Sequence, residues 1–129
     1  MLSDGSGAYS FLSLGAGCTY IVTPTKAPLS PGAAGIDTAD AIRIQRHFLG
    51  LALLTGCSLS AADVNGDGHV TTIDVIAIQR FFLGLSTGIG NAGKYQFSPP
   101  AFVYPNLGSD QGNNFSALIF GDVASPFAD

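Results

Sequence analysis

Apolar positions along the chain change their spacing twice, and this divides the chain into strand-like ends and a helical middle. In residues 38–50 and 72–84, apolar side chains recur at the spacing of a helix. In residues 8–14, apolar and polar positions alternate around Tyr9 and Phe11, which is the period of a strand with one buried face. Similar short runs resume after the helical middle. The predicted order of elements is therefore β, then α, then β.

Five short segments are predicted to be strands. A turn rich in glycine and serine, residues 3–7, precedes the first of them. We expect the apolar side chains of the first two strands to share a core with the later ones, although the helices separate them in the sequence. The predicted strands are residues 8–14, 19–23, 94–98, 101–104 and 114–120, and the core residues named for the first two are Tyr9, Phe11, Tyr20 and Val22.

The helical middle contains one sequence twice. Residues 38–50 and 72–84 are identical at nine of thirteen positions, at an offset of 34 residues. Each copy ends on glycine, the usual residue just past the C-terminus of a helix. Two such helices can bury their apolar faces against each other as a pseudo-symmetric pair. The side chains expected in their shared core are Ile44, Phe48, Ile78 and Phe82.

A twelve-residue loop leads into the second copy and has the oxygen donors of a calcium site. A loop of the EF-hand type supplies ligands from positions 1, 3, 5, 7, 9 and 12, with glycine at position 6. Counted from residue 63, a glycine falls at position 6 and an acid at position 12. The predicted ligands are the side chains of Asp63, Asn65 and Asp67, the backbone carbonyl of His69, Thr71 directly or through water, and both carboxylate oxygens of Asp74.

The loop before the first copy lacks most of these donors. Only Asp37 and Asp40, at positions 9 and 12, have carboxylates. Two carboxylates without the first three ligands cannot enclose a calcium ion, so one Ca²⁺ is expected per chain. Asp40 is interpreted as a residue at the helix start, where its charge suits the N-terminal end of the helix dipole. The positions of the missing donors and glycine hold Leu29, Pro31, Ala33 and Ala34.

Composition and charge exclude several classes of protein. The chain has 129 residues, is 47% hydrophobic and 11% charged, and has a net charge of −4 with five Lys and Arg. This composition excludes a disordered tail and gives no basic patch for nucleic acid. No apolar run approaches the roughly 20 residues that span a bilayer. The first residues do not resemble a signal peptide, so we expect a removed export signal or a numbering that begins within a longer chain.

No catalytic motif is present, and we predict that the protein is not an enzyme. His47 lies on a predicted helix and His69 lies in the calcium loop, and neither has the context of a catalytic triad. The glycine-rich stretches lack the strand–turn–helix setting of a phosphate loop. Three of the carboxylates are assigned to calcium, and the others lie mainly in turns or tails.

The two cysteines allow two interpretations. In an extracellular protein, Cys18 and Cys57 would form a disulfide that joins the β region to the segment before the calcium loop. The alternative is two buried thiols that never meet. We favour the disulfide, because it would fix the helical middle to the strands around it.

The duplicated loop-and-helix, with aspartate at position 12 and no long entering helix, resembles type I dockerin domains over roughly residues 29–84. Dockerins are calcium-dependent modules that bind cohesins in extracellular assemblies. The resemblance implies that the partner contacts come from residues just before the last ligand and from the helix end. In this sequence these are Thr72, Ile73, Gln79 and Arg80, mirrored by Thr38, Ala39, Gln45 and Arg46.

The two ends of the chain resemble a different family. Residues 4–26 and 95–117 look like the middle and last strands of a transthyretin-like (prealbumin-like) β-sandwich of bacterial surface proteins. This resemblance implies an α+β chain in which residues 1–28 and 93–129 form one small antiparallel sandwich, with residues 29–92 as an inserted dockerin-like unit. The family has further strands before the first turn, so the sandwich is expected to be incomplete at its N-terminal side.

These features favour a calcium-stabilised structural subunit of an extracellular or cell-surface assembly. An incomplete sandwich has an unpaired strand edge, which would recruit a strand from a neighbouring copy and build a head-to-tail filament. We expect the apolar stretch of residues 117–129, or a strand near it, to leave its own subunit and fill the gap. The alternatives are a dockerin-type adaptor that binds a cohesin, and a passive spacer within a larger surface protein. None of these contacts nucleic acid or enters a membrane.

Overall fold

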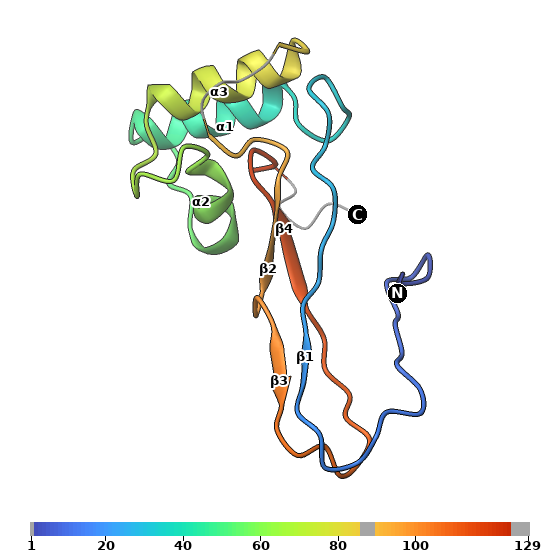
Figure 1. Ribbon diagram of the computed structural model, residues 1–129. Helices are drawn as coiled ribbons and strands as arrows, with labels where there is room; N and C mark the ends of the chain where they lie inside the picture. Colours follow the sequence, from blue (N-terminus) through green and yellow to red (C-terminus); the bar gives the residue numbers. More distant parts are fainter. Residues whose placement is uncertain (1, 86–89, 125–129) are drawn as a thin grey trace. The chain divides into compact units, whose positions relative to one another are not determined.

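The computed structural model describes residues 2–85 and 90–124. Helices and strands are mixed along the chain, which agrees with the predicted α+β class (Figure 1). The predicted helices at both copies and the strands at four of the five predicted places are confirmed. In chain order the elements are β1 (Tyr20–Val22), α1 (Thr38–Phe48), α2 (Gly56–Ala62), α3 (Thr72–Phe82), β2 (Tyr95–Ser98), β3 (Phe102–Tyr104) and β4 (Ser116–Ile119).

The strands form two separate antiparallel sheets of two strands each. β1 pairs with β3, and β2 pairs with β4. The chain divides into two compact units: a strand unit of residues 1–23 and 101–114, and a helical unit of residues 24–100 and 115–129. β2 and β4 belong to the helical unit, whereas the predicted division placed them with the other strands. A β-sandwich requires more than these two separate sheets of two strands, so the sandwich stays a prediction.

In the strand unit, β1 and β3 form a short ribbon with one outward face. Tyr20 lies opposite Tyr104, and Ile21 lies opposite Val103. The side chains of Ile21 and Val103 are both exposed, so this pair forms the outward face of the ribbon. The ribbon continues beyond its strands through two backbone hydrogen bonds of 2.8 Å each. The N–H of Gly17 donates to the carbonyl of Leu107, and the N–H of Leu107 donates to the carbonyl of Cys18.

The predicted strand at residues 8–14 does not form. The turn before it does form, since Asp4 Oδ1 accepts the backbone N–H groups of Ser6 and Ala8 at 2.9 Å each. The segment that follows is held mainly by a side chain: Tyr9 Oη donates to the carbonyl of Asn113 at 2.9 Å. Phe11 is 47% exposed, so the predicted core position of this residue is wrong. Alternation alone cannot form a strand where no neighbouring strand is paired with it.

Helices α1 and α3 begin with the same capping arrangement. The side chain of Asp37 accepts the N–H of Ala39 at 2.7 Å, and Thr71 Oγ1 accepts the N–H of Ile73 at 3.3 Å. Each helix also has an aspartate at its third position that accepts the N–H of the capping residue. These bonds satisfy N–H groups that have no partner within the helix, which fixes where both helices start.

The core of the helical unit lies between α1 and α3, which pack side by side (Figure 1). Ile44 and Ile78 are fully buried, as predicted. Phe48 and Phe82 are 50% and 42% exposed, so their predicted core positions are wrong, and Phe81 is buried in their place. In α3, Phe81 lies three positions after Ile78 and faces the core, whereas Phe82 lies four positions after it and is turned outward.

β2, β4 and α2 complete this core from outside the duplicated sequence. Ile119 at the end of β4 and Val123 beyond it are buried in the same cluster as the helix residues. β4 packs against α2, which the sequence analysis missed and which contributes buried Ala61 and Ala62. The stretch of residues 117–129, or a strand near it, was predicted to leave its own subunit. For its described part, up to Ala124, this prediction is wrong, because these residues pair with β2 and fill the core of their own chain.

A substitution at Gly93 can test how tightly this core is packed. It has φ +81°, and a Cβ there would lie 2.7 Å from the ring of Phe81 and 3.1 Å from the carbonyl of Leu29. Gly50 has a similar φ of +71° with open space around it, so it is a matched control. We expect Gly50→Ala to lower the free energy of unfolding by about 1 kcal/mol. Gly93→Ala should lower it by about 1–3 kcal/mol more, because overpacking is added to backbone strain. Equal losses in urea unfolding would contradict this packing.

Candidate metal centre

The loop between α2 and α3 curls around the carboxylate of Asp63. Asp63 Oδ1 accepts the N–H groups of Gly66 and Asp67 at 2.9 and 3.1 Å, and Oδ2 accepts that of Gly68 at 2.9 Å. Gly66 and Gly68 have φ of +73° and +86°, which side chains other than glycine rarely adopt. The two glycines therefore allow the sharp turn that brings the loop back over its first residue.

Asn65 and Asp67 form the next turn of the loop. Asn65 Nδ2 donates to Asp67 Oδ2 at 2.9 Å, and the N–H of His69 donates to Asp67 Oδ1 at 2.8 Å. The hydrogen bonds from Asn65 and from the backbone of His69 lower the pKa of Asp67 below its usual value. The carboxylate of Asp67 is therefore exposed and ionised at neutral pH, which suits a ligand of a cation.

Asp74 is the buried member of the set and ties both ends of the loop to α3. Its Oδ1 accepts the N–H groups of Val64 and Asn65 at 2.9 and 3.2 Å. Its Oδ2 accepts the N–H of Thr71 at 2.8 Å. The residue is fully buried, so these bonds replace water around its carboxylate.

His69 and Thr71 lie in the second half of the same loop. The side chain of His69 is exposed, in keeping with a residue that would offer only its carbonyl. Thr71 is half-buried and already caps α3 with its hydroxyl. The loop therefore joins the capping of the helix and the predicted ligand set in one short segment.

The chemistry of this loop fits calcium. Carboxylate, amide and carbonyl oxygens are the ligands that Ca²⁺ prefers, and the loop offers them from one continuous stretch of backbone. In the described structure the carboxylates accept backbone N–H groups, and no three His, Cys, Asp or Glu side chains of residues 2–85 and 90–124 are grouped as a metal cluster. The donor set thus fits by type and order, and the ligand assignment stays a prediction.

The equivalent residues of the first copy have other partners. Asp40 is at the start of α1, as interpreted from the sequence, and its Oδ2 accepts the N–H of Asp37 at 2.9 Å. Its Oδ1 accepts the N–H groups of Val123 and Ala124 at 2.7 and 2.8 Å. Asp37 is exposed and uses its own carboxylate as the helix cap. Both acids that the first loop keeps therefore support the helix start.

The predicted partner contacts all lie on the exposed surface of α1 and α3 or at their starts. The sequence analysis missed apolar residues on the same two helices. Ile42 and Ile76 are 52% and 48% exposed, and Leu49 and Leu83, just past the helix ends, are 63% and 66% exposed. Their identity in both copies was the signal that could have identified them. The predicted contacts that the structure exposes are Thr38, Ala39, Gln45, Arg46, Thr72, Ile73, Gln79 and Arg80.

The two cysteines are exposed free thiols in the structure. Cys18 belongs to the strand unit, and Cys57 is the second residue of α2 in the helical unit. The alternative of two buried thiols is wrong, because both side chains are exposed. The disulfide stays a prediction for the oxidised protein.

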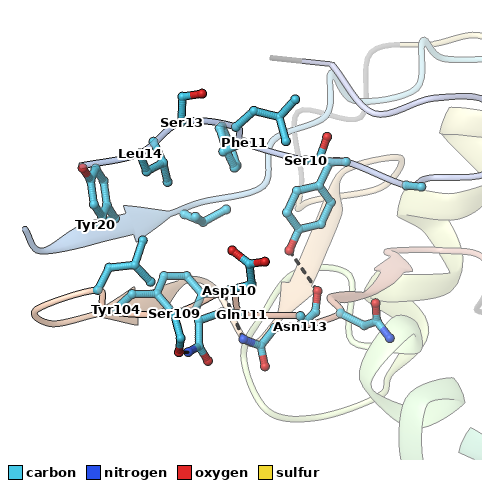
Figure 2. A pocket seen from close by; sticks show the side chains of 18 of the residues that line it. Ser10, Phe11, Ser13, Leu14, Tyr20, Tyr104, Ser109, Asp110, Gln111 and Asn113 are labelled. Atoms are coloured by element: carbon cyan, nitrogen blue, oxygen red, sulfur yellow. Dashed lines mark hydrogen bonds between the residues drawn. The ribbon is translucent and has the colours of Figure 1, made fainter. Parts of the chain in front are cut away.

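The strand unit also contains an open hollow (Figure 2). Phe11 and Leu14 lie on one side of it, and Ser109, Gln111 and Asn113 lie on the other. Asn113 Nδ2 donates to Tyr104 Oη at 3.0 Å, and Gln111 Nε2 donates to Ser109 Oγ at 3.2 Å. One wall is therefore apolar and the other is built from paired polar side chains.

Comparison with known proteins identifies part of the helical unit. Residues 34–83, which include α1, α2, the loop and α3, match the family model of the dockerin type I domain. No curated protein and no solved structure matches the chain. In the described part of the chain, no helix has the length and apolar character to cross a membrane. The chain thus contains a dockerin-like region, of a kind that binds calcium and a protein partner and occurs in secreted or cell-surface proteins.

Replacing one exposed ligand should test the site. We expect the chain to bind one Ca²⁺ with a dissociation constant on the order of 10⁻⁷ to 10⁻³ M. Asp67→Ala should weaken binding at least about a hundredfold in titration calorimetry, because it removes a charged ligand. Asp110→Ala, which removes the same charge from the strand unit, is the control and should leave the affinity unchanged. Equal effects of both changes would show that the loop is not the site.

Proposed function

We propose that this protein is a calcium-stabilised extracellular interaction module that docks a protein partner, with a cohesin as the partner class, on the paired helices α1 and α3. The observation that carries this proposal is the repetition of one exposed surface on both helices. Ile42 and Ile76 are exposed to nearly the same extent, as are Leu49 and Leu83. Single exposed apolar side chains are common on protein surfaces, but the same side chains at the same positions of both helices would offer a partner the same contacts twice.

The polar neighbours of these residues support the same conclusion. Gln45 and Arg46 on α1 repeat as Gln79 and Arg80 on α3, and all four are exposed. Arginine is common in protein interfaces because its long side chain packs and also donates several hydrogen bonds. An apolar pair next to an arginine and an amide gives each helix the composition of a small interface.

Calcium would hold this surface in shape. Asp63, Asp67 and Asp74 bring three carboxylates into one loop that ends at the start of α3. Without a cation these charges repel one another, and a bound ion would replace that repulsion with attraction to all three. The residues of the loop orient α3 through Thr71 and Asp74, so the ion would stabilise the helix that presents half of the surface.

The proposal includes no catalytic activity. His47 Nδ1 accepts the N–H of Leu54 at 2.9 Å, which gives this imidazole a role in fixing the turn after α1. His69 is exposed in the calcium loop. Neither histidine is paired with a nucleophile among the described hydrogen bonds.

A second function is favoured by the strand unit. Phe11, Leu12 and Leu14 are exposed, and Figure 2 shows Phe11 and Leu14 on one side of the hollow. Such a hollow would accept a strand from a neighbouring copy, which would complete a β-sandwich and link copies head to tail into a filament. The donor strand would lie outside residues 117–124, because these are bound in their own chain. In this case the protein is a structural subunit.

Changes on the helix surface should abolish capture of a cohesin. We expect the wild-type chain to bind an immobilised panel of type I cohesin domains in Ca²⁺ and to be released by chelator. The double change Ile42→Asp and Ile76→Asp should weaken binding at least about a hundredfold, because it buries two unpaired charges in the interface. Ile21→Asp, at an isoleucine of the strand unit that is 67% exposed, should bind as the wild type does. Loss of binding in the control, or no binding by the wild type, would contradict this function.

Light scattering tests the structural subunit. Under that function, the wild-type chain forms oligomers that grow with concentration, and Phe11→Asp reduces them because a charge enters the hollow. The cohesin-surface double variant should still assemble and is the control. A wild-type chain that stays monomeric at millimolar concentration would exclude assembly through this unit.

A further inference from the structure

Two buried aspartates at the starts of the paired helices hold backbone segments in the same way. Asp74 Oδ1 accepts the consecutive N–H groups of Val64 and Asn65 at 2.9 and 3.2 Å. Asp40 Oδ1 accepts the consecutive N–H groups of residues 123 and 124 at 2.7 and 2.8 Å. The exposures of the two aspartates are 0% and 2%. The pattern of donors and acceptors is thus repeated, although the segments that donate come from different parts of the chain.

The donating segments also match in sequence and burial. Residues 63–65 read Asp-Val-Asn, and residues 122–124 read Asp-Val-Ala. Val64 and Val123 are both fully buried and belong to the same core cluster. The segment after β4 therefore occupies, for α1, the place that the first residues of the calcium loop occupy for α3.

We infer that residues 121–124, the C-terminal clasp, supply the missing first half of the first loop. The site at Asp40 is then a binding site for a backbone segment of this chain, and the clasp takes at the first repeat the place that residues 63–65 take at the second. Asp40 and the clasp residues are 83 and 84 positions apart in the sequence. This explains why the residues directly before α1 lack the expected donors: another part of the chain has taken their place.

The chemistry of the first repeat favours a peptide over an ion. Asp40 Oδ1 accepts two N–H groups, and the cap at Asp37 occupies the only other acid that the loop keeps before α1. Ala124 stands where Asn65 stands in the second repeat, so the side-chain oxygen of the third loop position is absent. Asp74 Oδ1 accepts two N–H groups in the same way, so the repeats differ in the oxygen donors around that carboxylate: Asp122 stands where Asp63 stands, but the third position has no side-chain oxygen.

The clasp also contacts the second repeat. The N–H of Gly121 donates to the carbonyl of Ala61 at 2.9 Å, at the C-terminal end of α2. A Cβ at Gly121 would lie 3.3 Å from Ile36 Cδ1 and 3.5 Å from Ile78 Cγ1, so the clasp backbone passes close to side chains of both repeats. The closed module therefore extends to residue 124, well beyond the matched residues 34–83.

Amide hydrogen exchange measured by NMR on the full, calcium-loaded chain tests this inference. We expect the amides of Val123 and Ala124 to be protected in the wild type. Asp40→Ala should lower their protection about tenfold or more, because both lose a charged acceptor, while the amides of Val64 and Asn65 stay protected. Asp40→Asn keeps an oxygen that can accept these N–H groups and should lose less. The Ca²⁺ stoichiometry should remain one in all variants that fold.

Several results would overturn the inference. The first is exchange of both clasp amides at unprotected rates in the wild type. The second is a loss of protection in Asp40→Asn that is spread evenly over the helical unit, since this would show a general structural role. This variant decides the question even where Asp40→Ala fails to fold. The third is binding of two calcium ions by the wild-type chain, which would give the first repeat a metal in place of the clasp.

Discussion

The helical unit depends on two buried carboxylates that accept backbone N–H groups. Asp40 and Asp74 each sit at the third position of a helix, where they satisfy the N–H of the capping residue and also hold a second segment. Hydrogen bonds to a charged acceptor are worth roughly 1.5–3 kcal/mol each, and a buried carboxylate without them would be strongly unfavourable. Both aspartates therefore fix the helix start and the path of the chain that crosses it.

The hydrogen bonds of these two carboxylates stabilise the helical unit together with its small apolar core. Among the described residues, Phe81 has the one aromatic ring in the buried core, and the other core residues are aliphatic side chains of modest size. The carboxylates connect these segments to the helices directly beside the buried side chains of Val64 and Val123. The helix pair thus combines an apolar seam, centred on Ile44 and Ile78, with two polar connections at its edge.

The sequence predicted the parts whose signals are local. Repetition identified α1 and α3, and the spacing of oxygen donors identified the loop before α3. Periodicity did not decide between Phe81 and Phe82, because both flank the helix face of Ile78, and only the packing beside Gly93 distinguishes them. The segment of residues 8–14 alternates like a strand but has no paired neighbour. The match between residues 63–64 and 122–123 is only two letters long, so the role of the clasp could be found only from the hydrogen bonds.

The distance between Asp40 and the clasp has a consequence for the order in which the chain can fold. During synthesis or export the second repeat can assemble once residue 93 has emerged, since the carbonyl of Val64 accepts the N–H of Asn91 and the ring of Phe81 packs against Gly93. The first repeat must wait until residue 124 is free, because its closing segment comes after both sheets. In that interval α1 lacks the partner of Asp40, and the apolar surface that Ile119 and Val123 later cover is open to solvent. Domains with such long-range closure fold slowly and are exposed to misassembly while they wait.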